Sequence, residues 1–413
     1  MCPVKDDQPQ TLLITLSGQD RPGVTHRLFS ALAPHSTSVL DIEQMVVRGR
    51  LMLAVLVGVG VGADISDVTG AEDAARAVAR ELDMEIQTRP GAGEDSERRR
   101  NRVHVTIMGA PLAAESVADI TALLAERGGN IDRIRRIASY PVTAVEFQGS
   151  GVRVDELRLP LVEAASRHGA DVAIQEAGLD RRGQYLVVMD VDSTFIQDEV
   201  IDLLADEAGV MADVAAITER AMAGELDFEE SLRERVALLV GLPVEALERV
   251  RSRITLTPGA RTLCRTLNRL GYRIALVSGG FTDIITPIAA ELGVTDVRAN
   301  GLEIVDGHLT GRVQGPVIDR MGKRTALEAF ARQYGIPQRR TIAIGDGAND
   351  IDMMDAAGLG IAFNAKPAAR AAADTSVNVP YLDSILFLMG ITREEIESAD
   401  LRDGISLEES RRN

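Results

Sequence analysis

Apolar and polar positions in the first 175 residues follow two kinds of periodicity. The segments with these periodicities come in one order, and that order occurs twice along the chain. Stretches with a period of two predict strands, and stretches with a period near 3.6 predict amphipathic helices. Each copy reads strand, helix, two strands, helix and strand, which is the βαββαβ order of a ferredoxin-like module. Gly109 follows Gly18 by 91 residues, and Asp132 follows Asp41 by the same interval, so we infer an internal duplication. The expected elements are 11–17, 22–32, 39–47, 51–59, 71–82 and 84–88, and then 103–108, 114–126, 130–139, 142–148, 154–167 and 171–175.

The second half of the chain has short apolar runs that end abruptly in polar residues. Such a run is typical of a strand inside a parallel sheet, where both faces are buried. Helical patterns alternate with the runs, which predicts a doubly wound α/β fold. Because ligands bind beyond the carboxyl ends of such strands, the residues after each run are expected to line a cleft. Three strand ends are notable: DVDST at 190–194, SGG at 278–280 and GDGAND at 345–350.

Two segments interrupt this alternation. Residues 200 to about 256 have little strand character, and within them 221–239 is amphipathic, with Phe228 on the apolar face. A helical lobe inserted after the first strand is expected to cover the strand ends as a lid. Residues 297–317 contain Asn300-Gly301 and Asp306-Gly307, pairs that favour hairpin turns at the edge of a sheet.

The negative charge of the chain limits its partners. The formal net charge is −17 and the pI is near 4.9. Nucleic acids and anionic membranes require a basic surface, so we expect neither, and small molecules or further copies of the chain instead. The longest apolar run, 51–61, is too short to span a bilayer, and the first ten residues lack a signal-peptide core, so a cytoplasmic protein is expected. Cys2 and Cys264 predict neither a disulfide nor a zinc site.

The close spacing of Asp190 and Asp192 has two explanations. Two ionised carboxylates repel each other, so their surroundings either hold a cation or keep one of them protonated. A polar turn in which Asp caps the next helix would give the same pattern. Chemistry is favoured by the other strand ends, which supply a further acid, Asp346, and a Ser-Gly-Gly sequence suited to an anion. One lysine, Lys323, lies between them in the chain.

The first repeated module resembles an ACT domain, the amino-acid-sensing module of metabolic enzymes. The resemblance rests on GQDRPGV at 18–24. Gly18 lets a backbone approach closely, and a helix N-terminus offers N–H groups to a carboxylate, so the resemblance implies an amino-acid site at this turn. A tight turn alone would also explain the glycines. The second copy has Gly109 at the matching position but lacks DRPG, so a ligand at that copy is an open question.

The second half resembles the haloacid dehalogenase superfamily of phosphotransferases, and within it the phosphoserine phosphatases. The resemblance rests on DVDSTFIQDE at 190–199, AMAGELDFEESLRERV at 221–236 and SGGF at 278–281. With two ACT-like modules ahead, the chain is similar to a long, mycobacterial-type form. The resemblance implies that Asp190 is the nucleophile and Asp192 the acid/base, and that Mg²⁺ is held by Asp190, the backbone carbonyl of Asp192, and Asp346.

The same resemblance implies O-phospho-L-serine as substrate and L-serine as both product and regulatory ligand of a homodimer. Glu199 would meet the substrate ammonium and Arg235 its carboxylate, which together recognise an amino acid. Met222 and Phe228 would line the lid pocket. The remaining substrate-binding residues are expected to be Ser278, Gly279, Lys323 and Asn349. Two other functions stay open: a phosphatase of another small phosphomonoester, and a non-catalytic amino-acid sensor.

The expected domains follow from these patterns. The two ACT-like modules cover 1–90 and 102–178, with a charged, glycine-containing linker at 91–101 between them. The phosphatase core covers 185–390 with its helical cap at about 196–257, and 391–413 forms a C-terminal tail.

Overall fold

The computed structural model describes residues 10–59, 65–92, 101–178, 181, 183 and 185–411, so the predictions for Cys2 lie outside the described residues. The chain divides into two compact units, Met1–Arg98 and Arg99–Asn413. The first unit contains one βαββαβ module, and the second contains the other module and a seven-stranded sheet. The expected fold class, a doubly wound sheet preceded by two such modules, is confirmed.

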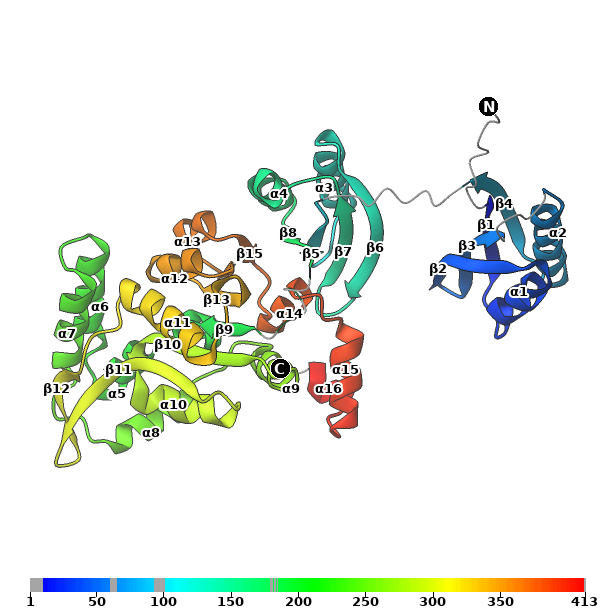
Figure 1. The fold of residues 1–413 in the computed structure, drawn as a ribbon. Coiled ribbons are helices and arrows are strands. Elements are labelled where there is room, and N and C mark those ends of the chain that lie inside the picture. The colour runs from blue at the N-terminus through cyan, green and yellow to red at the C-terminus, as the bar shows by residue number, and fades with distance from the viewer. Residues whose placement is uncertain are drawn as a thin grey trace. The chain divides into compact units, whose positions relative to one another are not determined.

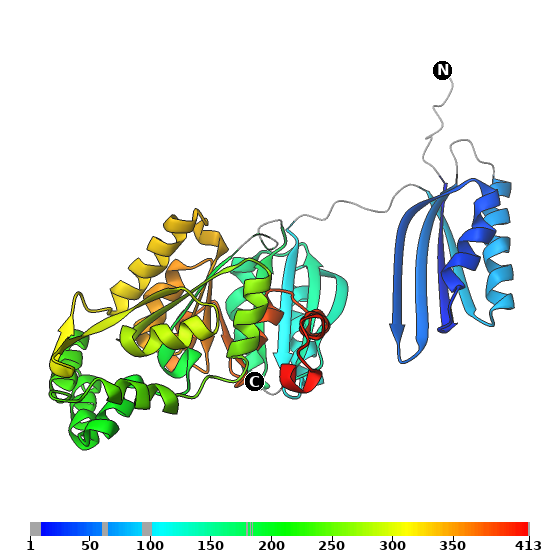
Figure 2. The same ribbon diagram turned by 90° about the horizontal axis from the view of Figure 1, so that it is seen from below.

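The first module is an antiparallel sheet in the order β2-β3-β1-β4, with both helices on one face (Figures 1 and 2). Alternate residues of β1, Leu12, Ile14 and Leu16, are fully buried beneath the helices. This period of two is what a sheet covered on one face requires. Gly23 precedes α1 with a φ of 94°, which glycine adopts without strain. The elements are β1 (Gln10–Gln19), α1 (Val24–Leu32), β2 (Thr37–Val47), β3 (Arg50–Val59), α2 (Ile65–Glu81) and β4 (Glu85–Ala92).

The second module repeats this topology in the order β6-β7-β5-β8. Val105 and Phe147 belong to the core beneath its helices. Met108, Ala144 and Ala173 point to the opposite face and belong to the core of the seven-stranded part. This module is therefore packed on both faces of its sheet. The elements are β5 (Val103–Gly109), α3 (Ala114–Glu126), β6 (Asn130–Ala138), β7 (Thr143–Ser150), α4 (Val154–Arg167) and β8 (Asp171–Glu176).

The seven-stranded sheet has the order β12-β11-β10-β9-β13-β14-β15, and only β12 is antiparallel to its neighbour. The central strand β9 is buried on both faces. Val187 and Met189 enter one core, and Leu186 and Val188 enter the other. This explains the uninterrupted apolar run. The strands are β9 (Leu186–Met189), β10 (Arg273–Phe281), β11 (Asp296–Val305), β12 (His308–Gln314), β13 (Thr341–Gly345), β14 (Leu359–Phe363) and β15 (Thr375–Val377).

Helices form a layer on each face of this sheet (Figure 1). One layer contains α9 (Ala260–Arg269) and α10 (Thr282–Glu291), and the other contains α11 (Arg320–Tyr334), α12 (Ile351–Ala356) and α13 (Pro367–Ala372). A helical cap follows β9, as the sequence predicts. It consists of α5 (Val200–Ala208), α6 (Met211–Met222), α7 (Phe228–Ala237) and α8 (Glu245–Arg253). No helix in the described ranges is long and apolar enough to cross a bilayer.

Two local predictions were wrong. Residues 221–239 are not one helix, because Gly224 takes a φ of 80° and Asp227 starts α7 with a capping box to Glu230. Asn300 and Gly301 are not a turn but lie inside β11. The predicted turn at Asp306 and Gly307 is confirmed, and both residues have positive φ.

The C-terminal segment, which the sequence predicts to be a tail, contains two helices. Short α14 (Ile385–Leu388) is followed by α15 (Arg393–Arg402) and α16 (Leu407–Arg411). Arg393 is 4% exposed, pairs with Asp383 at 2.8 Å and donates to the carbonyl of Ser410 at 2.9 Å. These buried contacts hold α15 and α16 against the rest of the second unit.

Candidate active site

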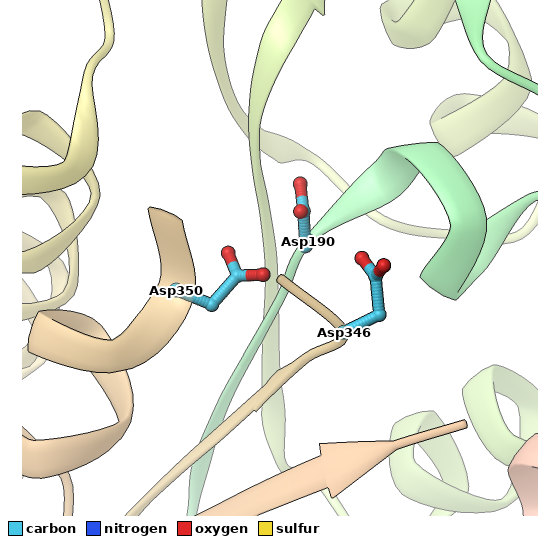
Figure 3. Close-up of side chains that lie close together, drawn as sticks. All are labelled: Asp190, Asp346 and Asp350. Carbon is cyan, nitrogen blue, oxygen red and sulfur yellow. The ribbon is translucent and has the colours of Figure 1, made fainter. Parts of the chain in front are cut away.

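Two acids emerge side by side because their strands are neighbours. Met189 of β9 pairs with Ile344 of β13, and the backbone N–H of Asp190 donates to the carbonyl of Ile344 at 2.9 Å. Asp346 follows β13 directly, and Asp350 follows one short turn later. Figure 3 shows the carboxylates of Asp190, Asp346 and Asp350 gathered at these strand ends. One oxygen from each lies within 4.8 Å of the others, and all three residues are buried.

Lys323 joins two of these acids from α11. Its ammonium lies 2.6 Å from Asp190 Oδ2 and 2.7 Å from Asp350 Oδ1, and the residue is 1% exposed. Burial alone would lower the pKa of Lys323, but the charges of Asp190 and Asp350 outweigh it and raise the pKa. The lysine is therefore a fixed positive charge against Asp190.

The three carboxylates carry more charge than one lysine balances. Burial raises the pKa of both Asp190 and Asp346, and the nearby charge of Asp350 raises each further. Clustered carboxylate oxygens are the donors that Mg²⁺ prefers, and a divalent cation would relieve this repulsion. The donor set thus fits Mg²⁺.

The carboxylate of Asp192 is not part of this cluster and binds other groups. Ser193 has a φ of 55°, and this left-handed residue kinks the turn that follows β9. Asp192 Oδ1 accepts from the N–H of Val200 at 2.8 Å, and Oδ2 accepts from the Ser278 hydroxyl at 2.9 Å. Burial raises the pKa of Asp192 despite these two donors. Its carboxylate is absent from the cluster of three, which leaves only its backbone carbonyl for a metal.

A cavity of about 150 Å³ opens above these groups, between the strand ends and the cap. The cap contributes Phe228 and Arg235. A Cβ on Gly279 would lie 2.9 Å from the ring of Phe228, so glycine is needed for this close approach. Eight of the predicted residues line the cavity: Asp190, Asp192, Glu199, Phe228, Arg235, Gly279, Asp346 and Asn349.

Glu199 and Arg235 carry opposite charges on this lining. Water reaches Glu199 from the cleft, yet the protein around it raises its pKa to about 7 by desolvation, with the charge of Asp192 adding to the effect. The Ser193 hydroxyl donates to Glu199 at 2.8 Å. Arg235 donates through Nε to the carbonyl of Ser231 at 3.2 Å. The cavity lining thus offers an acidic group for the ammonium of an amino acid and a cation for its carboxylate.

Comparison with known proteins decides the family. A curated phosphoserine phosphatase of Streptomyces coelicolor is 53% identical over 94% of both chains. Phosphoserine phosphatase SerB2 of Mycobacterium tuberculosis is 49% identical over 95% of this chain and 96% of that protein. This chain belongs to the phosphoserine phosphatase family. It is a phosphoric monoester hydrolase.

The segments of this phosphatase match family descriptions separately. Residues 187–355 match the haloacid dehalogenase-like hydrolases, and residues 10–89 and 102–175 each match an ACT domain. We call the two modules ACT1 and ACT2. A Vibrio cholerae structure described as a probable phosphoserine phosphatase, unliganded form, is 35% identical with a TM-score of 0.57, over 70% of this chain and 86% of that one.

Other predicted residues of the phosphatase lie outside the cavity lining. Ser278 and Lys323 are buried next to it and contact Asp192 and Asp190. The side chain of Met222, at the end of α6, lies outside the described residues. Gly18 and Gly109 lie in β1 and β5 of the ACT modules.

Sequence reasoning missed three residues that shape the site. Asp350 stands four positions after Asp346, within the same GDGAND motif, so the motif itself was a usable signal. Asn300, misread as a turn, accepts from Ile318 N–H at 2.8 Å and donates to Gly279 O at 2.7 Å, which holds the Gly279 loop. Lys366 lines the cavity and had no signal beyond following a strand.

Proposed function

We propose that this chain hydrolyses O-phospho-L-serine to L-serine and phosphate through an aspartyl-phosphate on Asp190, with Mg²⁺ as cofactor. The observation that carries the proposal is the Asp190 carboxylate. It lines the cleft, contacts Lys323 at 2.6 Å and stands beside Asp346 and Asp350. A phosphate dianion can approach a carboxylate only where positive charge compensates both.

In the first step, an Asp190 oxygen forms a bond to phosphorus while the bond from phosphorus to the serine oxygen breaks. Asp192 donates its proton to that departing oxygen. In the second step a water attacks phosphorus, Asp192 accepts the water proton, and the bond to Asp190 breaks to release phosphate. The Ser278 and Val200 contacts hold the Asp192 carboxylate still between these two transfers.

Asp190, Asp346 and the backbone carbonyl of Asp192 are the residues proposed to hold Mg²⁺, with Asp350 completing the acidic set. The ion supplies charge compensation for the phosphoryl oxygens. Lys323 adds a fixed positive charge, and Gly279 and Asn349 are placed on the lining to donate hydrogen bonds to the same oxygens.

Substrate choice is proposed to rest on Glu199 and Arg235. Both line the cleft, and their opposite charges match the ammonium and carboxylate of phosphoserine. Phe228 closes the cap side above Gly279. Another small phosphomonoester would leave one or both charges without a partner.

The test is phosphate release over a panel of phosphomonoesters with and without Mg²⁺. Phosphoserine is expected to be preferred, and Asp190→Asn to abolish turnover in a folded protein. Arg235→Ala is expected to lower kcat/KM for phosphoserine by roughly 2 to 5 kcal/mol of transition-state binding, with a much smaller loss on an aryl phosphate. Preference for another ester would support the second phosphatase function, and no release from any ester would support a sensor.

We further propose that L-serine binds ACT1 at Gly18 and lowers activity. Among the described residues no side chain caps α1, and its first turn has no acid, so its N–H groups suit a carboxylate. We propose a homodimer in which a second copy covers the ACT1 face opposite the helices, where Leu13, Met45 and Met52 are 38%, 48% and 44% exposed. Light scattering checks the dimer, and Met52→Glu is expected to give monomers.

A further inference from the structure

The use of basic residues in this chain is strongly biased. Of its 45 lysine and arginine residues, 42 are arginine and only three are lysine: Lys5, Lys323 and Lys366. Lys5 lies outside the described residues. The other two both lie at the candidate active site, one against Asp190 and one on the cavity lining. Both described lysines thus lie where the proposed phosphate group would bind, in a chain that otherwise uses arginine.

The backbone of Lys366 is held in place by the catalytic strand end. After β14, Asn364 takes a φ of 43° and its N–H donates to Val377 O at 2.9 Å. The N–H of Lys366 then donates to the carbonyl of Asp346 at 2.9 Å, and Pro367 begins α13. Residue 366 is thus fixed beside a proposed metal ligand while its side chain remains exposed.

Among the described residues, the ammonium of Lys366 is a positive charge on the cavity lining that no carboxylate neutralises through an ion pair. Lys323 is taken by Asp190 and Asp350, whereas Lys366 makes no ion pair or side-chain hydrogen bond among the residues that the structure describes. Lys366 lines the same cavity as Glu199 and Asp346, and its charge acts against the burial that raises the pKa values of these two carboxyl groups.

We propose that Lys366 is a further substrate-binding residue, whose ammonium meets the phosphoryl group at the cleft mouth and also holds the phosphate product. This rests on the proposed phosphatase function. Four carboxylates line the cavity against Arg235 and Lys366, in a chain of net charge −17, so an incoming dianion needs this charge. An ammonium is a compact charge with three rotatable donors, which can stay on the phosphoryl oxygens as the group moves, whereas the guanidinium of arginine presents its donors in a fixed plane.

The test is Lys366→Met and Lys366→Arg in the full chain. For Lys366→Met we expect KM to rise about tenfold on phosphoserine and equally on an aryl phosphate, with kcat within about threefold, since one solvent-screened charged contact is lost. Calorimetric titration with inorganic phosphate should show a similar loss of affinity. The dependence of kcat/KM on ionic strength should become weaker. Lys366→Arg should recover only part of the loss.

Arg332→Met is the matched control, because it removes the same charge from an exposed position on α11. Unchanged KM and phosphate affinity in Lys366→Met would overturn the proposal, as would an equal effect of Arg332→Met. A loss confined to phosphoserine would also overturn it, because the lysine would then meet the carboxylate. If the unmodified enzyme fails to hydrolyse phosphoserine, the proposed function falls, while the phosphate titration still decides the role of Lys366.

Discussion

ACT1 and ACT2 have the same strand order and the same helix-facing core, but the opposite faces of their sheets differ. In ACT2, Thr106, Met108 and Glu146 on that face are at most 2% exposed, because the seven-stranded part covers them. In ACT1 the corresponding face remains exposed, with Leu13 at 38% and Met52 at 44%. The helix-facing core makes the module fold, and the other face decides what the module joins.

Strand register identifies the substitutions behind this difference. Thr106 pairs with Glu146 in ACT2, and its counterpart Thr15 pairs with Ala54 in ACT1. Glu146 is fully buried and is contacted by Arg181 at 2.5 Å, Arg135 at 3.3 Å and His104 at 3.4 Å. Arg181 also donates to the carbonyl of Leu388. Where ACT1 has a small residue, ACT2 has the centre of an ionic cluster that ties it to the catalytic part.

The turns after the first strand differ as well. A Cβ on Gly109 would lie 3.0 Å from the carbonyl oxygen of Pro111 and 3.2 Å from Cα of Leu112, so in ACT2 the chain folds back over its own glycine. The three atoms nearest to a Cβ on Gly18 all belong to the flexible side chain of Met84. ACT2 also has Glu115 in the first turn of its helix, which disfavours a carboxylate ligand. These differences favour ACT1 as the module that carries the proposed L-serine site, whereas ACT2 is packed against the catalytic part.

The largest expected effect is at Glu146. Glu146→Ala leaves three basic groups without their carboxylate and should lower the free energy of unfolding of the second unit by about 3 to 5 kcal/mol. All five tyrosines lie in that unit and the chain has no tryptophan, so tyrosine fluorescence in a urea titration reports on it alone.

The pH dependence of this effect has a defined sign. Burial raises the pKa of Glu146, but His104 and Arg181 outweigh it and the net pKa is lowered to about 2. Its stabilisation is therefore complete above the unfolded pKa near 4.5 and is lost as pH falls towards 2, so the difference between the two proteins should shrink over that range. Ala54→Ser, at the matching ACT1 position, should change the free energy of unfolding of the first unit by less than about 0.5 kcal/mol, measured by circular dichroism because ACT1 contains no tyrosine. If Glu146→Ala and Ala54→Ser lowered the free energy of unfolding by similar amounts, the contrast between the two ACT sheet faces would be wrong.

At Asp171 we expect a smaller effect on stability, with a pH dependence opposite to that at Glu146. It is 3% exposed and accepts from the backbone and side-chain N–H groups of Asn378, after β15, at 2.7 and 2.5 Å. Burial raises its pKa to about 6. A raised carboxyl pKa means that stability is present below the unfolded pKa and is lost as pH rises through 6, by about 3 kcal/mol.

Asp171→Asn should remove that change, so the stability difference between variant and unmodified protein should vary between pH 4 and 7. Urea titrations followed by tyrosine fluorescence measure it. Glu85→Gln is the matched change in ACT1, because Glu85 pairs with Ser17 where Asp171 pairs with Met108, and it is exposed. Its effect is followed by circular dichroism, since ACT1 has no tyrosine. A difference that stays constant with pH would show that Asp171 does not titrate at the ACT2 interface.

The smallest expected effect is on regulation. L-serine should inhibit with a component that excess phosphoserine does not relieve, and a coupling of about 1 kcal/mol would weaken activity roughly fivefold. Gly18→Ala crowds the ACT1 turn against Met84 and should reduce that component while basal turnover stays near normal. Steady-state inhibition at several phosphoserine concentrations measures it.

Gly109→Ala is the counterpart in ACT2 and should leave the serine response unchanged in protein shown to be folded by tyrosine fluorescence. Purely competitive inhibition, or a response lost in Gly109→Ala but kept in Gly18→Ala, would reverse the roles assigned to the two modules.

The sequence alone determined the elements and the position of the chemistry. Strand and helix periods, and polar residues that end apolar runs, depend on neighbours in the chain, so the βαββαβ repeats and the acids after β9 and β13 could be predicted. Parallel strands bring their carboxyl ends to one edge, which is why Asp190 and Asp346 were expected in one cleft. Even the error at 221–239 was local, because the capping sequence from Asp227 to Glu230 was readable.

Only the tertiary structure decided which distant side chains share a site. Lys323 bridges Asp190 and Asp350, Asn300 supports the Gly279 loop, and Glu146 collects its partners across the ACT2 interface. Each contact joins residues far apart in sequence, and a lone Lys, Asn or Glu has the same local pattern whether it faces water or a buried partner. Burial and charge pairing arise when elements pack, so the two ACT copies differ in a way that their shared period of two does not encode.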